Sequence, residues 1–227
     1  MIRVFIGYDS KLPVLYNVAQ HSIQVRASQP VSITPIMLSQ LKGIYTRDVN
    51  PLASTEFSFS RFLVPYLSSY SGWSLFVDND VLMLDDIASL WALRDDRYAV
   101  MCTKHAQKTG EQTKFLNAPQ TPYEKKNWSS CVLFNNARCK ALSLDYVNSA
   151  TGLELHQFKW LGDDALIGDI PLEWNVLADC HTEVAARPSM IHYTLGGPYF
   201  REYEACEYSR EWFKERDALV YCAQRGE

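Results

Sequence analysis

Two aspartates, Asp78 and Asp80, stand one residue apart directly after an apolar run at residues 73–77. Two carboxylates at this spacing in a turn can both face one hard divalent cation, and such a cation neutralises the charge of a diphosphate leaving group. A solvated turn is the alternative, since chance alone gives about one Asp-x-Asp pattern in a chain of this composition. The position favours a metal site, because charges at the end of a buried strand are costly without a cation or ligand. Asn79, between the two, is a candidate ligand contact.

A histidine, His192, follows another apolar run and precedes two glycines, Gly196 and Gly197. A histidine near a strand end is more often a hydrogen-bonded structural residue than a metal ligand. The glycines favour a ligand here, because they let the backbone approach phosphate oxygens closely and donate N–H groups. We therefore take His192 as a candidate metal ligand and the two glycines as candidate phosphate contacts.

Three further residues have the chemistry of a nucleotide site. Tyr8 and Asp9 end the first apolar run, where an open α/β sheet places its ligand, although either could simply begin a turn. Arg61 lies among aromatic and apolar neighbours, where an unpaired guanidinium is costly. It could bind a phosphate or sugar, or it could pair with an acid such as Glu56.

The elements that must position these residues follow an α/β pattern. Residues 2–6 are apolar and predict a strand, apolar residues recur at helical spacing over 15–27, and 31–38 resumes strand chemistry despite Pro35. This order predicts a β-α-β opening with parallel strands. An amphipathic helix, kinked or bounded at Pro65, is expected at 57–70, and helical or turn structure is expected at 81–93. Further strands are expected at 73–77, 98–103, 131–134 and 190–193, and a long loop or hairpin at 104–127.

Composition limits the class of protein. With 227 residues, 47% of them hydrophobic and 21% charged, the chain is expected to form one globular domain. Its net charge of -4 and the lack of a Lys/Arg-dense block predict no nucleic-acid binding. No signal peptide or membrane-spanning stretch is recognisable, so a cytoplasmic location is expected, with peripheral membrane association left open. The six cysteines form no C-x-x-C pair, and we expect mostly buried, reduced thiols.

A family resemblance covers most of the chain. It rests on seven segments in this order: Phe-Ile-Gly-Tyr-Asp9, Phe-Ser-Arg61-Phe-Leu, Leu-Phe-Val-Asp78-Asn-Asp80, Asn127-Trp-Ser-Ser-Cys-Val-Leu-Phe-Asn135, Gly-Asp163-Asp164-Ala-Leu, Glu-Trp174-Asn175 and Ile-His192-Tyr. The set resembles retaining glycosyltransferases of the glycogenin and lipopolysaccharide-galactosyltransferase type. It is far more specific than any one of its members.

The resemblance implies a GT-A type fold, a single α/β domain with a Rossmann-like mixed central sheet flanked by helices. Residues 1–103 would form the nucleotide-sugar-binding half and 104–227 the acceptor-side half. By the same resemblance, Asp78 touches both metal and donor sugar, while Asp80 and His192 complete the set of protein ligands for Mn²⁺ or Mg²⁺.

Two departures from the family pattern affect the site. The family usually has a lysine before the proline that follows the metal histidine, where it touches the donor phosphates, but here Gly197 precedes Pro198. The family's Asp-Gln pair near the anomeric carbon aligns most simply with Gly162 and Asp163. The resemblance therefore favours Asp163 as the catalytic carboxylate, with Asp164 a close second, and the other of the two would cap the following helix.

The sequence thus predicts a metal-dependent glycosyltransferase. It would move a sugar from a nucleotide-sugar, with a UDP-sugar expected, to a saccharide or other hydroxyl acceptor with retention of configuration. A non-catalytic nucleotide-sugar or glycan-binding protein is the main alternative. A phosphohydrolase of the haloacid-dehalogenase type is disfavoured by Val81 and by the late position of the motif. A sugar-nucleotide pyrophosphorylase would need a glycine-rich loop, which residues 10–13 do not provide.

Overall fold

The computed structural model describes residues 1–48, 54–106, 124–180 and 187–220. Most of the loop or hairpin expected at 104–127 lies outside the described residues, as does Cys222. The other cysteines follow the expectation, because Cys102, Cys131, Cys139 and Cys180 are buried and Cys206 is half-buried.

The chain opens with the predicted β-α-β unit. Strand β1 (Ile2–Gly7) leads through helix α1 (Pro13–Gln24) to strand β2 (Val31–Ile36), and the two strands pair in parallel. Pro13 at the first turn of α1 suits a helix start, since a proline there removes no helical hydrogen bond. Pro35 is tolerated because β2 is an edge strand.

The main sheet has six strands in the order β2-β1-β3-β6-β5-β7. β1 is parallel to β2 and β3, β6 is antiparallel to β3 and β5, and β5 is parallel to β7, so the sheet is mixed as expected. Its remaining strands are β3 (Trp73–Val77), β5 (Val100–Cys102), β6 (Cys131–Asn135) and β7 (Ile167–Asp169).

A second sheet of three strands, in the order β4-β9-β8, was not predicted. It consists of β4 (Val81–Met83), β8 (Val176–Leu177) and β9 (Met190–His192). The prediction of helix or turn over 81–93 is therefore wrong for its first residues and right for α3 (Ile87–Ala92). A three-residue apolar strand has no periodicity of its own, and pairing with β9 determines it.

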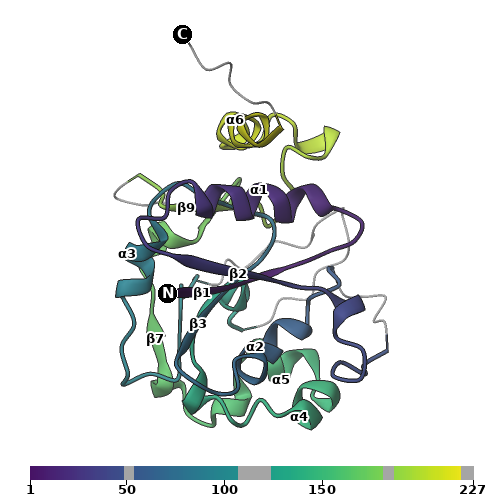
Figure 1. Ribbon diagram of the computed structural model, residues 1–227, viewed down its shortest axis with the longest axis vertical. Coiled ribbons are helices and arrows are strands. Elements are labelled where there is room, and N and C mark those ends of the chain that lie inside the picture. The colour runs from purple at the N-terminus through teal and green to yellow at the C-terminus, as the bar shows by residue number, and fades with distance from the viewer. Residues whose placement is uncertain (49–53, 107–123, 181–186, 221–227) are drawn as a thin grey trace.

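Helices cover both faces of the main sheet (Figure 1). α1 lies on one face, with the carboxyl-terminal helix α6 outside it, while α2, α4 and α5 lie on the other. The region expected to be helical at 57–70 is a 3₁₀ turn followed by the short helix α2. The remaining helices are α2 (Val64–Leu67), α4 (Leu144–Ser149), α5 (Gly152–His156) and α6 (Ser209–Val220). The 3₁₀ turns are Leu38–Gln40, Ser60–Leu63, Trp128–Ser130, Asn136–Arg138, Lys159–Leu161, Asp164–Leu166, Leu172–Trp174 and Arg201–Tyr203.

Each face of the sheet buries its own apolar cluster. The face toward α2, α4 and α5 is aromatic, with Phe57, Phe62, Phe76 and Phe134 fully or almost fully buried. The face toward α1 and α3 is built mainly from aliphatic side chains of β1, β3 and β6. This two-sided core holds the strand ends, and hence the residues just beyond them, in fixed positions.

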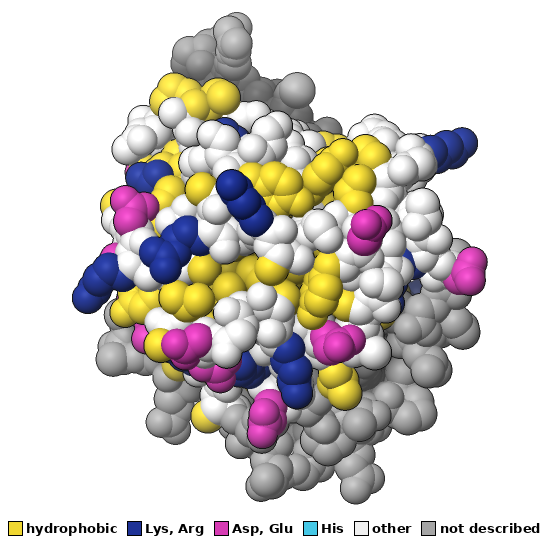
Figure 2. All heavy atoms as spheres, turned by 90° about the horizontal axis from the view of Figure 1, so that it is seen from below, with side chains coloured by type: hydrophobic (Ala, Val, Ile, Leu, Met, Phe, Trp, Pro, Cys, Tyr) yellow, Lys and Arg dark blue, Asp and Glu magenta, His cyan; other side chains and the backbone are white. Residues whose placement is uncertain are grey.

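The surface carries charges of both signs. Figure 2 shows basic, acidic and hydrophobic side chains interspersed on the face seen from below. A single-sign patch of the kind that tracks a nucleic-acid backbone is absent from the described residues of this face. Within the described ranges, no helix combines the length and the apolar character that crossing a bilayer requires.

Candidate metal centre

Asp78, Asp80 and His192 converge because the two sheets meet at the end of β3. The Asp78 amide N–H donates to the Ser130 carbonyl at 2.9 Å, which continues the pairing of β3 with β6 past Val77. β4 then begins, and its pairing with β9 places Val81 opposite His192. The Tyr193 N–H donates to the Asp80 carbonyl at 2.9 Å. Two main-chain contacts thus fix the turn that carries both aspartates.

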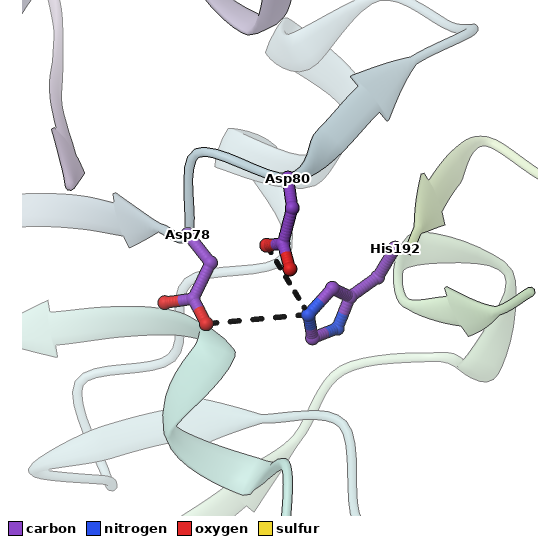
Figure 3. Close-up of side chains that lie close together, drawn as sticks. All are labelled: Asp78, Asp80 and His192. Carbon is purple, nitrogen blue, oxygen red and sulfur yellow. Dashed lines mark ion pairs between the residues drawn. The ribbon is translucent and has the colours of Figure 1, made fainter. Parts of the chain in front are cut away.

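The three side chains point toward one another (Figure 3). Nε2 of His192 lies 3.4 Å from Oδ1 of Asp80 and 4.0 Å from Oδ2 of Asp78. One ligand atom from each residue lies within 4.8 Å of the other two. Oδ1 of Asp80 is buried and accepts no hydrogen bond from the described residues. Two carboxylates, one imidazole and a buried oxygen without a donor suit a divalent cation such as Mn²⁺ or Mg²⁺.

A buried hydrogen-bond chain orients His192. Nδ1 of its ring lies 3.1 Å from Oδ1 of Asn175, an oxygen that can only accept, so Nδ1 carries the proton and Nε2 faces the aspartates with its lone pair. The Asn175 amide donates to Ser130 Oγ at 2.9 Å, and that hydroxyl donates to the Asn127 carbonyl at 2.7 Å. Sequence reasoning missed this role of Asn175, although the Trp174-Asn175 pair was among the segments that carried the resemblance.

Arg61 holds Asp78 from the other side. Its Nη1 donates to Asp78 Oδ1 at 2.6 Å and to the Ser129 carbonyl at 3.0 Å, and its Nε donates to the Ser58 carbonyl at 3.1 Å. The arginine is only 6% exposed. The predicted acidic partner therefore exists, but it is Asp78 and not Glu56, whose carboxylate accepts from the hydroxyl and the N–H of Ser10.

Burial and neighbouring charges shift the pKa values of Asp78 and His192. Loss of hydration raises the pKa of Asp78 to about 6, and the charge of Asp80 adds to the rise while Arg61 opposes it. Burial also lowers the pKa of His192, but the two carboxylates outweigh it, so the net shift is upward. A metal ion requires these ligands deprotonated. Cation binding to the cluster should therefore release protons near neutral pH.

We expect the Asp78 carboxyl to make the cation-free protein lose stability as pH rises from about 4 to about 6. Its pKa is raised from 3.8 to about 6 in the folded state, so the folded protein binds a proton in this range that the unfolded chain releases. The stabilisation is complete below pH ~4 and is lost above the folded-state pKa. Asp78→Asn should therefore flatten this part of the curve of melting temperature against pH, measured by calorimetry in EDTA. The same slope in wild type and variant would contradict the shift.

Tyr8 and Asp9, the predicted nucleotide contacts at the end of β1, both contact other residues of the protein. The two carboxylate oxygens of Asp9 accept the main-chain N–H groups of Lys11 at 3.0 Å and Glu56 at 3.3 Å. The ring of Tyr8 packs edge-on against Tyr16, with 5.6 Å between centroids. These contacts hold the end of β1 in place. The roles of Tyr8 and Asp9 in donor binding stay predictions.

The glycines after His192 are required by packing. Gly196 has a φ of +129°, and a Cβ there would lie 2.7 Å from the Tyr203 ring. A Cβ on Gly197 would lie 2.4 Å from the ring of Tyr199. These close approaches explain the glycines without a phosphate, so their predicted phosphate contact stays a prediction. Asn79 is buried, and its side-chain amide has no partner among the described residues.

Asp163 and Asp164 have different contacts, as their adjacency predicts. Asp163 precedes a 3₁₀ turn, and its carboxylate accepts the Ala165 N–H at 2.8 Å, so it is the capping residue. Asp164 pairs with the Lys125 ammonium at 2.5 Å. That ammonium also donates to the Gln157 carbonyl at 2.9 Å. The family resemblance favoured Asp163 as the catalytic carboxylate, whereas in the structure Asp163 caps the 3₁₀ turn. The catalytic roles of Asp163 and Asp164 stay predictions.

Comparison with known proteins gives the family of the chain. No protein-family model matches it. Protein CDI of Arabidopsis thaliana is 48% identical over 224 residues, covering 95% of this chain and 86% of the relative. The chain belongs to the Protein CDI family. The glycogenin and galactosyltransferase type that the sequence motifs resemble is not confirmed by these comparisons and stays a prediction.

The fold of this Protein CDI family member is that of solved glycosyltransferases. The bifunctional glycosyltransferase WbbM aligns with a TM-score of 0.68 at 14% identity, over 95% of this chain and 49% of WbbM, so the chain spans about half of that protein. The galactosyltransferase LgtC aligns with a TM-score of 0.62 at 11% identity over 98% of both chains. GlyE of Streptococcus pneumoniae TIGR4 gives 0.65 at 11%, over 97% of this chain and 63% of its own. The expected GT-A type α/β fold is thereby confirmed.

Proposed function

We propose that the protein is a metal-dependent glycosyltransferase that uses a nucleotide-sugar, a UDP-sugar in the first instance, and retains the configuration at the anomeric carbon. The observation that carries the proposal is the cluster of Asp78, Asp80 and His192, with its buried acceptor oxygen, at the end of a sheet strand. The fold shared with WbbM, LgtC and GlyE supports it. Residue 103 would divide a donor half from an acceptor half, and the cluster draws ligands from both.

The residues of the cluster and their two hydrogen-bond partners have different roles in the proposed reaction. Asp78, Asp80 and His192 would hold the cation, and a bound cation offsets negative charge on the departing diphosphate. Arg61 opposes the rise in the pKa of Asp78 and fixes the direction of its carboxylate. Asn175 fixes the His192 ring, which keeps Nε2 directed at the cation position.

A donor screen tests the function. Binding of UDP-, GDP- and ADP-sugars would be measured by calorimetry with Mn²⁺, Mg²⁺ or EDTA, followed by chromatography for released nucleoside diphosphate. Metal-dependent release from one donor, faster with a hydroxyl acceptor, is the expected result. Tight binding without any release would favour the non-catalytic sugar-binding alternative. Phosphate release from p-nitrophenyl phosphate without use of any donor would favour the phosphohydrolase.

Asp163 and Asp164 should respond differently to replacement. We expect Asp163→Ala to lower stability by about 0.5–2 kcal/mol with modest kinetic change, because a capping contact is lost. Asp164→Asn should reduce kcat and leave donor affinity nearly unchanged, since a carboxylate that stabilises charge at the anomeric carbon acts mainly in the transition state. Urea unfolding and steady-state kinetics measure both effects. Wild-type kcat in Asp164→Asn and in Asp163→Asn would show that neither carboxylate takes part in the reaction.

A further inference from the structure

Several buried side-chain polar atoms have no hydrogen-bond partner in the part of the chain that the structure describes, and two of them belong to Asn79 and Asp80 of the metal-centre turn. Among the described residues there are eight such atoms, belonging to Ser60, Asn79, Asp80, Thr103, His105, Asn136, Trp160 and Tyr199. Native proteins leave few buried polar atoms unpaired, and each one calls for an explanation such as a ligand. Asp80 is explained by the cation. The hydroxyl of Tyr199 and Nε2 of His105 are not among the candidate ligand atoms of the metal centre, so the cation does not explain them.

Both rings lie within electrostatic range of the cluster. Burial raises the pKa of the Tyr199 phenol well above its ordinary value, and the nearby charge of Asp80 adds to the shift. Burial lowers the pKa of His105 to about 4, and the charge of His192 adds to that shift. Each ring is therefore neutral near pH 7. Neither belongs to the set of ligand atoms that could hold the cation, which contains Asp78, Asp80 and His192.

Tyr199 and His105 lie on segments that adjoin the metal centre. Tyr199 follows Pro198 in the loop after His192, and it packs so closely on Gly197 that a Cβ there would lie 2.4 Å from its ring. His105 follows β5, and its carbonyl accepts the indole N–H of Trp128 at 3.1 Å. Trp128 begins the 3₁₀ turn whose next two carbonyls accept from Arg61 and from the Asp78 N–H. Packing therefore holds the Tyr199 ring, and a main-chain hydrogen bond holds His105 beside this turn.

The chemistry of the two groups matches an anion. A neutral phenol donates one hydrogen bond, and a neutral imidazole can donate through Nε2. Hydrogen bonds from neutral donors to a charged oxygen are stronger than those between neutral groups. The loop also lacks the lysine that would contact phosphate in the resembled family, because Gly197 stands before Pro198. Residues 193–200 contain neither lysine nor arginine, so a side-chain donor to a diphosphate from this loop would be uncharged.

We propose that the Tyr199 hydroxyl donates to a phosphate oxygen of a nucleoside diphosphate in place of the missing lysine, with His105 Nε2 as a second neutral donor. This assignment rests on the proposed function and specifies how its donor is held. Because both groups are uncharged, neither offsets the diphosphate charge as a lysine would. Nucleotide binding should consequently depend on the cation more strongly than a lysine-containing site would require.

Tyr199→Phe tests the assignment with little risk to the fold. It removes only a hydroxyl that donates to no described residue, so the melting temperature in EDTA should stay close to that of wild type. The dissociation constant for UDP with Mn²⁺, measured by calorimetry, should increase about tenfold, as expected for one hydrogen bond to a charged group. His105→Phe should weaken UDP binding in the same measurement.

Tyr193→Phe is the matched control. Its hydroxyl donates to the Tyr208 carbonyl at 2.9 Å, so this variant should lower the melting temperature and leave UDP binding unchanged. Uridine binding should be the same in wild type and Tyr199→Phe, since uridine lacks phosphate. Unchanged UDP affinity in Tyr199→Phe or in His105→Phe overturns the assignment for that residue. Failure of the wild type itself to bind any nucleoside diphosphate overturns the proposed function instead.

Discussion

Asp80→Ala is expected to reduce metal-dependent sugar transfer by about 10³-fold or more, because it removes a ligand of the cation that offsets charge on the leaving diphosphate. The fold should survive the change. Among the described residues no donor makes a hydrogen bond to the buried Oδ1 of Asp80, and its charge repels that of Asp78 but attracts a protonated His192. Because these two effects oppose each other, the cation-free protein should melt close to the wild-type temperature. His192→Ala should abolish transfer as well, with some loss of stability because Asn175 loses its partner.

Two measurements separate this metal role from a structural one. Mn²⁺ should raise the melting temperature of wild type but not of Asp80→Ala, since only the wild type binds the ion tightly. Calorimetry with UDP and Mn²⁺ should give the same contrast. Asp217→Asn, on the exposed outer helix α6, is the control and should behave like wild type in both. Full activity of Asp80→Ala, or full wild-type activity in EDTA, would refute the metal assignment.

Arg61→Met is expected to destabilise the protein by about 3–5 kcal/mol, the usual effect of removing one partner of a buried ion pair. Asp78 would be left partly buried without its counter-charge, and the carbonyls of Ser58 and Ser129 would lose their donor. The pKa of Asp78 should rise further, because Arg61 now opposes the effect of burial. Mn²⁺ should then bind more weakly at pH 7. Urea unfolding and calorimetry measure the two effects.

A double variant tests whether the unpaired Asp78 carboxylate causes the loss of stability in Arg61→Met. If the unpaired carboxylate causes it, Arg61→Met combined with Asp78→Asn should be more stable than Arg61→Met alone. Arg61→Lys keeps the charge but loses the planar fork, so it should lie between wild type and Arg61→Met in stability and in donor use. Arg97→Met, at an exposed pair with Asp95, is the control and should change little. Wild-type stability of Arg61→Met would contradict the assignment.

The three residues that the structure brings together in the candidate metal centre could be selected from sequence because their signals are local. Asp78 and Asp80 follow a run of apolar residues, and such a run predicts a buried strand whose end lies at the edge of the sheet. His192 ends another apolar run and precedes two glycines. Residue type and strand position made all three candidates, and the family resemblance gave them the role of metal ligands. The β-α-β opening followed from periodicity.

The partners of these residues could not be recognised in advance. The sequence left Arg61 with a choice between a ligand and an acid such as Glu56, and the tertiary structure selects Asp78. Asn175 contacts His192 because β8 and β9 are neighbours in a sheet that was not predicted. Such contacts depend on which strands pair, and strand pairing is decided by packing of the whole chain.

The two adjacent aspartates show the same limit. The sequence established that Asp163 and Asp164 must point in different directions, because neighbouring side chains diverge in any regular backbone. Only the structure shows that the 3₁₀ turn begins at Asp164, which makes Asp163 the cap. Likewise, Tyr199 carries no motif, and its unpaired hydroxyl exists only because the folded chain buries it. Sequence determines which chemical groups are present and where strands end, whereas burial and pairing, which require the complete fold, determine what each group contacts.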